Sequence, residues 1–475
     1  MTNSKKTKII ATLGPSSNSL KIMEKLILEG VDVFRINFSH TNYENASKEI
    51  SLIRKLSAKL KIHVSILADL QGPKLRIGQI EENSQVKEDD LITFSCSKPF
   101  IGDSNKAFIN YKKFASDVKI GETVLLDDGK LIFEIVNIDK NNNVIAKVIQ
   151  GGPIQSNKGV NLPNTKISLP ALTKKDLEDA IFSIKEEVDW IALSFVRKKQ
   201  DLIELRKLIE KKSTHKIPII SKIEKPEALD NLSEIINNSD GLMVARGDLG
   251  VEIPAAEVPL IQKKLVLKAK KARIPIIIAT QMMETMIDSR TATRAEVNDV
   301  ANSVMDGADA VMLSAETSVG KFPVEVIKSM SSILMSVEGS KLIKVPNLPP
   351  SIKTKRYITK SICYHASIMA NEIGAKAICT LTNSGYTAFQ ISAWRPKSNI
   401  LVFTSNKRIL SQLNLLWGVK SFFYDSYEST DKTVEQINEI AKKFNYVSKG
   451  DFLINLTAMP VKSKGMVNTL RVSEV

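Results

Sequence analysis

Polar residues stand at the ends of several short apolar runs along the chain. In a parallel sheet covered on both faces the strand interiors are apolar, so polar side chains at strand ends are informative. Glu224 and Asp248 end two successive runs and could offer carboxylates to Mg²⁺, which takes one or two from a protein. Lys222 lies two residues before Glu224, on the same face of an extended strand. Together with Arg35 these residues suit phosphoryl transfer, in which spread negative charge must be neutralised.

Each of these residues also has a purely structural interpretation. Any one alone could be a solvated loop residue, and Lys222 with Glu224 could form a structural ion pair. Gly247 has no Cβ, so its backbone N–H could approach a carboxylate or phosphate closely. Convergence favours the functional interpretation, because six runs end in polar residues. These residues are Arg35, Asn37, Ser39 and His40; Asp69; Lys222 and Glu224; Arg246 and Asp248; Thr280 and Gln281; and Ser314 and Glu316.

The elements that must position these residues follow a repeated strand-then-helix rhythm. Short apolar runs bounded by turn residues predict strands, and the stretches between them predict helices. Eight strands are predicted, at residues 7–13, 31–38, 64–69, 190–195, 218–224, 241–246, 275–280 and 310–314. Helices are predicted at residues 19–28, 175–186, 226–236, 257–272 and 323–337. Eight such units predict an α/β protein with a TIM (β/α)8 barrel, formed by residues 1–72 and 168–341.

The rhythm is interrupted once, between residues 73 and 167. Alternating runs at 91–95 and 124–126, with turn signals at 128–129 and 141–143, predict a small inserted β-barrel domain. The insertion follows the third strand, and the loops after barrel strands form the catalytic face. We therefore expect residues 73–167 to act as a lid, and call them the lid below.

A third domain is predicted after a proline-rich break at residues 345–350. Strand and helix patterns resume there, with strands at residues 375–380, 400–403 and 452–456. We expect an open α/β domain over residues 342–475, a candidate regulatory domain.

Composition narrows the function class. The 475 residues are 43% hydrophobic and 25% charged, which is typical of a folded protein of several domains. The net charge of +15 favours anionic partners, but dispersed lysines and 6% aromatic residues disfavour nucleic acid. No apolar run approaches the ~20 residues of a membrane span and no signal peptide is evident, so we expect a cytoplasmic protein without membrane contacts. Three distant cysteines predict neither disulfides nor a zinc site.

Seven motifs, in order and spacing, together resemble pyruvate kinase over essentially the whole chain. They occupy residues 8–17, 34–40, 69–76, 158–163, 220–224, 243–252 and 279–282. The resemblance implies transfer of the phosphoryl group of phosphoenolpyruvate to ADP, giving pyruvate and ATP in the last step of glycolysis. It also implies Mg²⁺ or Mn²⁺ as cofactor and a homotetramer.

The resemblance also assigns roles to residues that match the motifs. It implies that Lys222 stabilises the transferring phosphoryl group, that Arg35 contacts it, and that Glu224 and Asp248 hold the divalent metal. Thr280 lies where it could relay a proton to the enolate, although a threonine hydroxyl needs help from water or a neighbour. The implied substrate-carboxylate contacts are Gly247, Asp248 and Thr280, and the implied nucleotide contacts are Asn37, His40, Arg76 and Lys158.

Functions of two other classes stay open. A barrel enzyme could bind phosphoenolpyruvate or a keto acid through Mg²⁺ for another reaction, or the chain could be an inactive metabolite sensor or a basic RNA-binding protein. Lys158 in the lid disfavours the first, because a second phosphate-bearing substrate needs its own cations. The intact set of Lys222, Glu224, Asp248 and Thr280 disfavours the others.

A departure from the commonest family pattern concerns the monovalent cation. In many members K⁺ is held at positions matching Asn37, Ser39, Asp69 and the backbone carbonyl of Leu70, and a glutamate stands at the position of Lys74. An ammonium has a size and charge close to those of K⁺, so Lys74 is predicted to replace the ion and remove the K⁺ requirement. The alternative is that Lys74 is a solvated hinge residue.

A loop in the third domain is a candidate phosphate site. Thr382, Ser384 and Thr387 follow a predicted strand and precede a helix, and the resemblance implies contacts with a sugar-phosphate effector. The alternative is a helix cap with a turn. The pattern is incomplete, because Tyr386 stands where many members have a basic residue and residues 462–465 match weakly.

Overall fold

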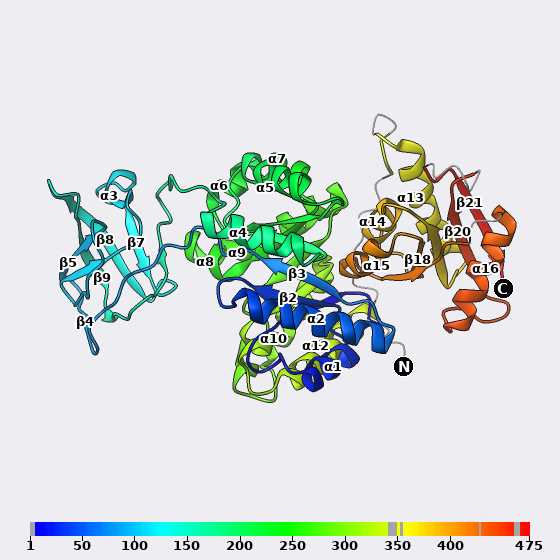
Figure 1. The fold of residues 1–475 in the computed structure, drawn as a ribbon, viewed down its shortest axis with the longest axis horizontal. Helices are drawn as coiled ribbons and strands as arrows, with labels where there is room; N and C mark the ends of the chain where they lie inside the picture. Colours follow the sequence, from blue (N-terminus) through cyan, green and yellow to red (C-terminus); the bar gives the residue numbers. More distant parts are fainter. Residues whose placement is uncertain (1–4, 341–348, 352–354, 427–428, 460–465) are drawn as a thin grey trace.

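Three bodies follow one another along the longest dimension of the molecule (Figure 1). The structure is a computed structural model and describes residues 5–340, 349–351, 355–426, 429–459 and 466–475. The barrel lies in the centre, the lid at one end and the C-terminal domain at the other (Figure 1). The predicted boundary at residues 341 and 342 and most of the proline-rich break lie outside the described residues.

The central body is the predicted TIM barrel. Eight parallel strands close into one ring in the order β1-β16-β15-β14-β13-β12-β3-β2. Their bounds are β1 Lys8–Thr12, β2 Val33–Asn37, β3 Ser65–Asp69, β12 Trp190–Leu193, β13 Ile219–Ile223, β14 Gly241–Ala245, β15 Ile276–Ala279 and β16 Ala310–Leu313. The predicted runs extend up to two residues beyond these strands at one end or both. Near the carboxyl ends, Arg35, Asn37, Asp69 and Lys222 lie inside their strands, and Glu224, Arg246, Thr280 and Ser314 directly follow theirs.

Helices surround the barrel and alternate with its strands (Figure 1). They are α1 Leu20–Glu29, α2 Tyr43–Leu60, α4 Lys174–Lys185, α5 Lys199–Lys212, α6 Pro226–Asp230, α7 Leu232–Asn238, α8 Arg246–Glu252, α9 Val258–Ala272, α10 Arg294–Asp306, α11 Ala315–Ser318 and α12 Pro323–Glu338, with 3-10 turns η1 Ala255–Glu257 and η2 Glu284–Ile287. The single helix predicted at residues 226–236 was wrong. Asn231 separates α6 from α7, and its side chain donates to the backbone carbonyls of Arg197 and Glu227, which competes with helix continuation.

The base of the barrel interior is closed by the C-terminal domain. The inner core contains strand residues such as Ile10, Leu67 and Trp190, and Leu415 of the C-terminal domain joins the same cluster. Leu415 is 1% exposed, and its neighbour Asn414 donates Nδ2 to the backbone carbonyls of Asp32 and His63. The two domains therefore share one hydrophobic core at this end.

The lid is built from β strands with a core of its own. The six-stranded sheet has the order β11-β7-β8-β9-β5-β6, and β4 pairs with β10 in a separate ladder. The bridges Arg76–Gly159 and Ile77–Ile109 link the two edges of the six-stranded sheet, which closes the predicted small barrel. Pro153 in β10 has no N–H to donate, which keeps that ladder short. The bounds are β4 Gln85–Val86, β5 Leu91–Ser95, β6 Lys106–Phe108, α3 Phe114–Asp117, β7 Thr123–Leu126, β8 Leu131–Ile138, β9 Val144–Gln150, β10 Gly152–Pro153 and β11 Val160–Asn161.

The C-terminal domain is the predicted α/β sheet with helices. Its strand order is β19-β18-β17-β20-β21, and β21 pairs antiparallel with β20. Strands β19 and β21 were not predicted from the sequence. The bounds are α13 Tyr357–Glu372, β17 Ala377–Leu381, α14 Tyr386–Ala393, β18 Asn399–Thr404, α15 Lys407–Gln412, η3 Leu413–Leu415, β19 Val419–Phe423, α16 Thr430–Lys443, β20 Phe452–Thr457 and β21 Thr469–Glu474.

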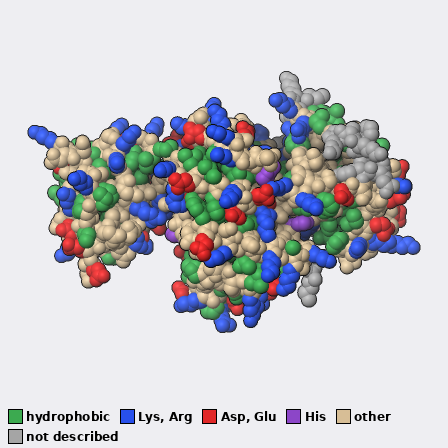
Figure 2. All heavy atoms as spheres, viewed as in Figure 1, with side chains coloured by type: hydrophobic (Ala, Val, Ile, Leu, Met, Phe, Trp, Pro, Cys, Tyr) green, Lys and Arg blue, Asp and Glu red, His purple; other side chains and the backbone are tan. Residues whose placement is uncertain are grey.

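Basic side chains are distributed widely over the surface. Lys and Arg side chains are spread over all three bodies on the face drawn in Figure 2, rather than gathered in one patch. Among the described residues, no helix combines the length and the apolar character needed to cross a membrane.

Candidate active site

A buried network of charges lies where β2, β3 and β13 end. Asp69 accepts from Arg35, with 2.6 Å between Nε and Oδ2, and its Oδ1 lies 3.3 Å from Lys222 Nζ. Lys222 Nζ also lies 3.0 Å from Oε1 of Glu224. Asp69 and Glu224 are at most 1% exposed, and Arg35 and Lys222 are each 8% exposed. The sequence predicted that these strand ends converge, and the structure brings all four residues together.

The charges in this network set each other's protonation. Burial lowers the pKa of Lys222, but the carboxylates of Asp69 and Glu224 outweigh it and raise that pKa above its usual value. Burial opposes ionisation of Asp69, yet Lys222 and Arg35 hold its pKa below the usual value. Burial raises the pKa of Glu224 above its usual value and outweighs the lowering effect of Lys222, while the negative charge of Asp248 adds to the rise. Lys222 therefore carries its positive charge. The ionised form of Glu224 would be stabilised by a further positive charge beside it, such as a metal ion.

Ser194 completes the surroundings of Lys222 and was missed from the sequence. It accepts a hydrogen bond from Lys222 Nζ at 2.7 Å and donates to the backbone carbonyl of Leu70 at 2.6 Å. The available signal was its place in the fourth predicted strand, one residue before the end of the run at 190–195. The Leu70 carbonyl, which the resemblance assigned to K⁺, is thus engaged by Ser194 in this structure.

Glu224 and Asp248 are suitable ligands for a divalent ion. Glu224 Oε2 accepts from the backbone N–H of Phe195 at 2.7 Å, while the buried Oε1 accepts no hydrogen bond of good geometry. Among the described residues, no three His, Cys, Asp or Glu side chains lie close enough to hold a metal by themselves. Mg²⁺ fits this set, because it takes few protein carboxylates and completes its shell with water and substrate oxygens.

The ends of β14 and β15 are joined by Thr280. Its Oγ1 accepts from the backbone N–H of Gly247 at 2.7 Å and donates to the carbonyl of Ala279 at 2.6 Å. Thr280 has φ of 67°, which is uncommon for a β-branched residue. Arg246 stabilises this conformation, because its Nη2 donates to the Thr280 carbonyl at 2.8 Å while Asp299 accepts from both Nη atoms at 2.6 and 2.7 Å.

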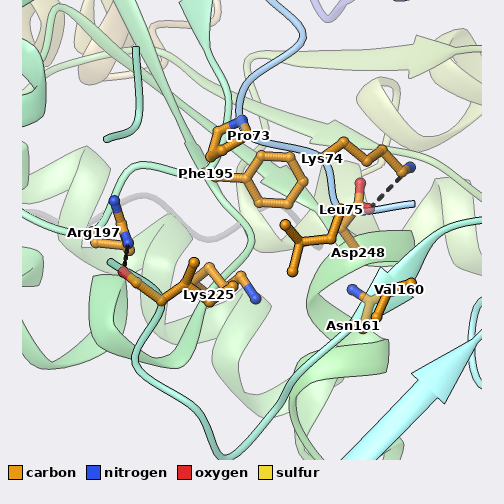
Figure 3. A pocket seen from close by; sticks show the side chains of 10 residues that line it. Pro73, Lys74, Leu75, Val160, Asn161, Phe195, Arg197, Lys225 and Asp248 are labelled. Carbon is orange, nitrogen blue, oxygen red and sulfur yellow. Dashed lines mark hydrogen bonds and ion pairs between the residues drawn. The ribbon is translucent and has the colours of Figure 1, made fainter. Parts of the chain in front are cut away.

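Lys74 reaches the site from the first connection to the lid. Its Nζ lies 3.7 Å from Oδ1 of Asp248, and the two side chains face each other in the cleft between barrel and lid (Figure 3). Asp69 is already paired with Arg35 and Lys222, so Lys74 places its charge beside a candidate metal ligand rather than beside Asp69. Asn37 and Ser39, the other side chains of the implied K⁺ site, bond to each other, with Asn37 Oδ1 accepting from the Ser39 N–H at 3.1 Å.

The residues assigned to nucleotide are less closely assembled. Partial burial of the ring, together with the positive charges of Arg76, Arg35 and Lys74, lowers the pKa of His40. Arg76 Nη1 donates to the carbonyl of Asn157 at 3.0 Å. Lys158 pairs within the lid with Asp127, at 3.0 Å between Nζ and Oδ1. The eighth strand end contributes less, since Glu316 turns back to accept from Ser314 N at 2.6 Å.

The candidate effector loop is largely engaged in its own turn. Thr387 is 4% exposed and its hydroxyl bonds to that of Thr380 at 2.9 Å. Thr382 Oγ1 accepts from the backbone N–H of Gly385 at 3.0 Å, which closes a turn before α14, and Gly385 is the N-cap of that helix without a side-chain cap. Ser384 lines a cleft between barrel and C-terminal domain. Residues 462–465 lie outside the described part of the chain.

Two family models match most of the chain. The family model described as pyruvate kinase, barrel domain, matches residues 4–327, and the model described as pyruvate kinase, alpha/beta domain, matches residues 360–473. The chain belongs to the pyruvate kinase family. Family membership carries the predicted enzyme activity, which is phosphoryl transfer from phosphoenolpyruvate to ADP with formation of pyruvate.

Individual pyruvate kinases match over nearly the full length. The chain is 38% identical to pyruvate kinase of Clostridium perfringens over 99% of this chain and 100% of that one. It is 40% identical to pyruvate kinase 2 of Synechocystis over 95% of this chain and 76% of that one. A crystal structure of a pyruvate kinase from Cryptosporidium parvum superposes with a TM-score of 0.91 at 33% identity, covering 99% of this chain and 96% of that one.

Proposed function

We propose that Lys222, Arg35, Glu224, Asp248, Gly247 and Thr280 carry out the pyruvate kinase reaction in this chain. The observation that supports this most strongly is the burial of Lys222 between Asp69 and Glu224, with Ser194 fixing its ammonium from a third side. Such a fixed cation stabilises a transferring phosphoryl group better than a mobile one, because no reorganisation is needed at the moment of reaction. Arg35, held by Asp69, adds a second fixed charge on the phosphoryl side.

Mg²⁺ or Mn²⁺ is the proposed cofactor, with Glu224 and Asp248 as its protein ligands. When bound, the ion supplies positive charge that offsets the phosphoryl oxygens. The chain orients the ligands itself: the Phe195 N–H fixes one oxygen of Glu224, and α8 begins directly after β14 and carries Asp248. Gly247 presents its backbone close to Thr280, and both border the proposed site of the substrate carboxylate.

Protonation of the enolate is the proposed role of Thr280 together with water. Its hydroxyl donates to the Ala279 carbonyl and accepts from Gly247, so it must rotate or exchange partners to pass a proton. The nucleotide is proposed to lie between the barrel and the lid, contacted by Asn37, His40, Arg76 and Lys158. Lys158 would exchange Asp127 for a phosphate, since their pair is partly exposed and weakly held.

K⁺ independence is proposed from the position of Lys74. Its ammonium lies at the same cleft as Asp248 and adds one positive charge there without a bound ion. We further propose a cytoplasmic homotetramer, from family membership. An effector phosphate at Thr382, Ser384 and Thr387 would require the loop to rearrange, because Thr387 is buried.

A coupled assay tests the proposal directly. Purified protein with phosphoenolpyruvate, ADP and Mg²⁺ should form pyruvate, while omission of either ADP or Mg²⁺ should stop turnover. Replacing both carboxylates by the matching amides, in the double variant Glu224→Gln with Asp248→Asn, should abolish turnover. It should also weaken Mn²⁺ binding, measured by electron paramagnetic resonance. Unchanged Mn²⁺ affinity in that double variant would contradict the ligand assignment.

A further inference from the structure

Glu252 is a buried carboxylate at the last position of α8, one helical turn after Asp248. It is 4% exposed, and its Oε1 accepts two hydrogen bonds. Lys225 Nζ donates one at 2.6 Å and Asn161 Nδ2 donates the other at 2.8 Å. Oε2 is also buried and has no hydrogen-bond partner among the described residues. Among the described residues, these two donors are therefore the hydrogen-bond partners of the buried carboxylate.

The three residues come from three separate segments. Lys225 directly follows Glu224, Glu252 belongs to the helix that carries Asp248, and Asn161 lies in β11 of the lid, three residues after Lys158. Lys225 and Asn161 are 7% and 8% exposed. Figure 3 shows Lys225 and Asn161 lining one cleft together with Asp248. The contact thus joins the lid to both segments that carry carboxylates of the site.

The second connection of the lid is anchored independently. Arg197, on the loop after β12, donates Nη1 to the Ile167 carbonyl at 2.5 Å and Nη2 to the Leu169 carbonyl. The chain therefore leaves the lid at a fixed point on the barrel. The opposite contact, between Asn161 and Glu252, is a side-chain contact that hinge motion can make or break.

We infer that Asn161, Glu252 and Lys225 form a latch that holds the lid against the barrel and sets the position of Lys158 relative to Glu224 and Asp248. The inference rests on the proposed function for the roles of Lys158, Glu224 and Asp248. Glu252, Lys225 and Asn161 are positioning residues, because they act through the lid and not on substrate atoms.

The latch changes the balance between lid positions for an electrostatic reason. If the lid opens, Asn161 leaves Glu252, and the carboxylate keeps only Lys225 and whatever water can enter. A hydrogen bond to a buried charge is stronger than one between neutral groups, so its loss favours the closed lid. The affinity for a nucleotide bound between lid and barrel depends on how often the lid is closed, whereas the affinity for a substrate held by barrel residues depends on it less.

Lid position can be measured without turnover. Cys96 in the lid is partly exposed, and Cys363 and Cys379 are buried. A dye on Cys96 and a second dye on Glu204→Cys, an exposed position of α5, would report the distance between lid and barrel. Asn161→Ala should shift the distance distribution toward more open lids in the absence of substrates. The same variant should raise KM for ADP about tenfold and KM for phosphoenolpyruvate less than about threefold.

A charge exchange across the contact separates the latch from a general structural role. Asn161→Asp alone places two carboxylates together beside one lysine and should open the lid further than Asn161→Ala. Adding Glu252→Gln restores one amide, one carboxylate and Lys225, and should return both the distance distribution and KM for ADP toward the parent values. Asn143→Ala is the matched control, because the Asn143 amide bonds to Asp139 inside the lid.

Each outcome is decisive. An unchanged distance distribution in Asn161→Ala, or no recovery in the double variant, would overturn the latch. Altered distances in a protein that forms no pyruvate would leave the latch standing and overturn the proposed function instead. If Asn161→Asp does not fold, Glu252→Ala with the same pair of dyes replaces it, with an expected shift toward open lids because Asn161 loses its acceptor.

Discussion

The hydroxyl of Thr280 accepts a hydrogen bond from the backbone N–H of Gly247, with 2.7 Å between the two atoms. Through this bond the residue after β15 fixes the first turn of the helix that carries Asp248. The ends of β14 and β15 are therefore held in a fixed position relative to each other. A change at Thr280 acts on the proposed carboxylate and metal sites as well as on any proton transfer.

Replacement of Thr280 distinguishes its hydroxyl from its shape. Thr280→Val removes both hydrogen bonds but keeps the branched side chain, and we expect kcat to fall about 100-fold, within the range that general acid-base groups contribute. Thr280→Ser keeps the hydroxyl, and its kcat should stay within about tenfold of the parent because the hydroxyl can still bond to Gly247 and Ala279. Steady-state kinetics at saturating substrates measures both. Equal losses in the two variants would refute a role for the hydroxyl.

Replacement of Lys222 tests the central charge. Lys222→Met removes the ammonium that neutralises Asp69 and Glu224, and we expect kcat to fall at least about 100-fold, as for loss of one preorganised donor. Circular dichroism and a melting curve should show that the barrel still folds. A folded variant with near-normal turnover would remove Lys222 from the mechanism.

Replacement of Lys74 tests the monovalent-cation proposal. The parent should turn over equally well in Na⁺, in an organic ammonium salt and in K⁺, because Lys74 supplies the charge beside Asp248. Lys74→Glu should acquire a K⁺ requirement, visible as activity that rises with K⁺ at constant ionic strength. Lys74→Met is the control for loss of charge alone. Strong K⁺ activation of the parent would contradict the proposal.

Gly72 tests how closely the first lid connection packs on the site. It has φ of +71°, and an added Cβ would lie 2.7 Å from Phe195 Cδ2 and 2.9 Å from Ser194 Cβ. Gly72→Ala should displace Ser194 from Lys222 and lower kcat about tenfold or more, since small displacements at a site are costly. Gly129→Ala is the control, because Gly129 has φ of +85° with no atom within 4 Å of the added Cβ.

The control isolates the backbone cost. Gly129→Ala should lower the free energy of unfolding by about 1–2 kcal/mol, because alanine must adopt a left-handed conformation there, and should leave kcat unchanged. Melting temperature and kcat measured for both variants separate the two effects. Similar kcat values in the two variants would mean that contact with Ser194 and Phe195 is not important.

Asp189 predicts a pH-dependent stability. Burial raises the pKa of this carboxyl from 3.8 to about 7. Between these values the folded state holds a proton that the unfolded state has released, so the free energy of unfolding falls as pH rises from about 4 to about 7 and stays lower above it. Asp189→Asn cannot ionise and still offers an acceptor to the Ile66 N–H.

The Asp189→Asn variant should therefore gain stability over the parent as pH rises. The gain is at most about 4 kcal/mol above pH 7, from the size of the shift, and should vanish near pH 4. Melting temperatures of both proteins at pH 5 and pH 8.5 measure it, with a larger difference expected at pH 8.5. The same difference at both pH values would show that Asp189 ionises normally in the folded protein.

The sequence predicted the barrel well because its strands are covered on both faces and therefore read as apolar runs. It also predicted that Lys222, Glu224 and Asp248 lie close together, since carboxyl ends of barrel strands share one rim. It could not predict Ser194, whose role depends on the Leu70 carbonyl of the neighbouring strand. Pairings across domains, such as Asn161 with Glu252, leave no local pattern at all.

The misjudged features have local physical causes. Residues 226–236 carry helical spacing, but the Asn231 side chain bonds to backbone carbonyls and interrupts the helix. The sequence also could not reveal that the Thr387 hydroxyl pairs with Thr380 inside the domain, while its proposed phosphate contact stays a prediction. Residue type and spacing do not reveal which way such small hydroxyl side chains turn.

Leu415 in the barrel core has a consequence for the order in which the protein is made. The last barrel strand ends at Leu313, so the ribosome must add about a hundred more residues, in roughly 5 to 20 s, before this plug exists. During that interval the nascent barrel has all eight strands but an open, apolar base. The C-terminal domain therefore completes the core of the barrel, although the barrel strands are synthesised before it.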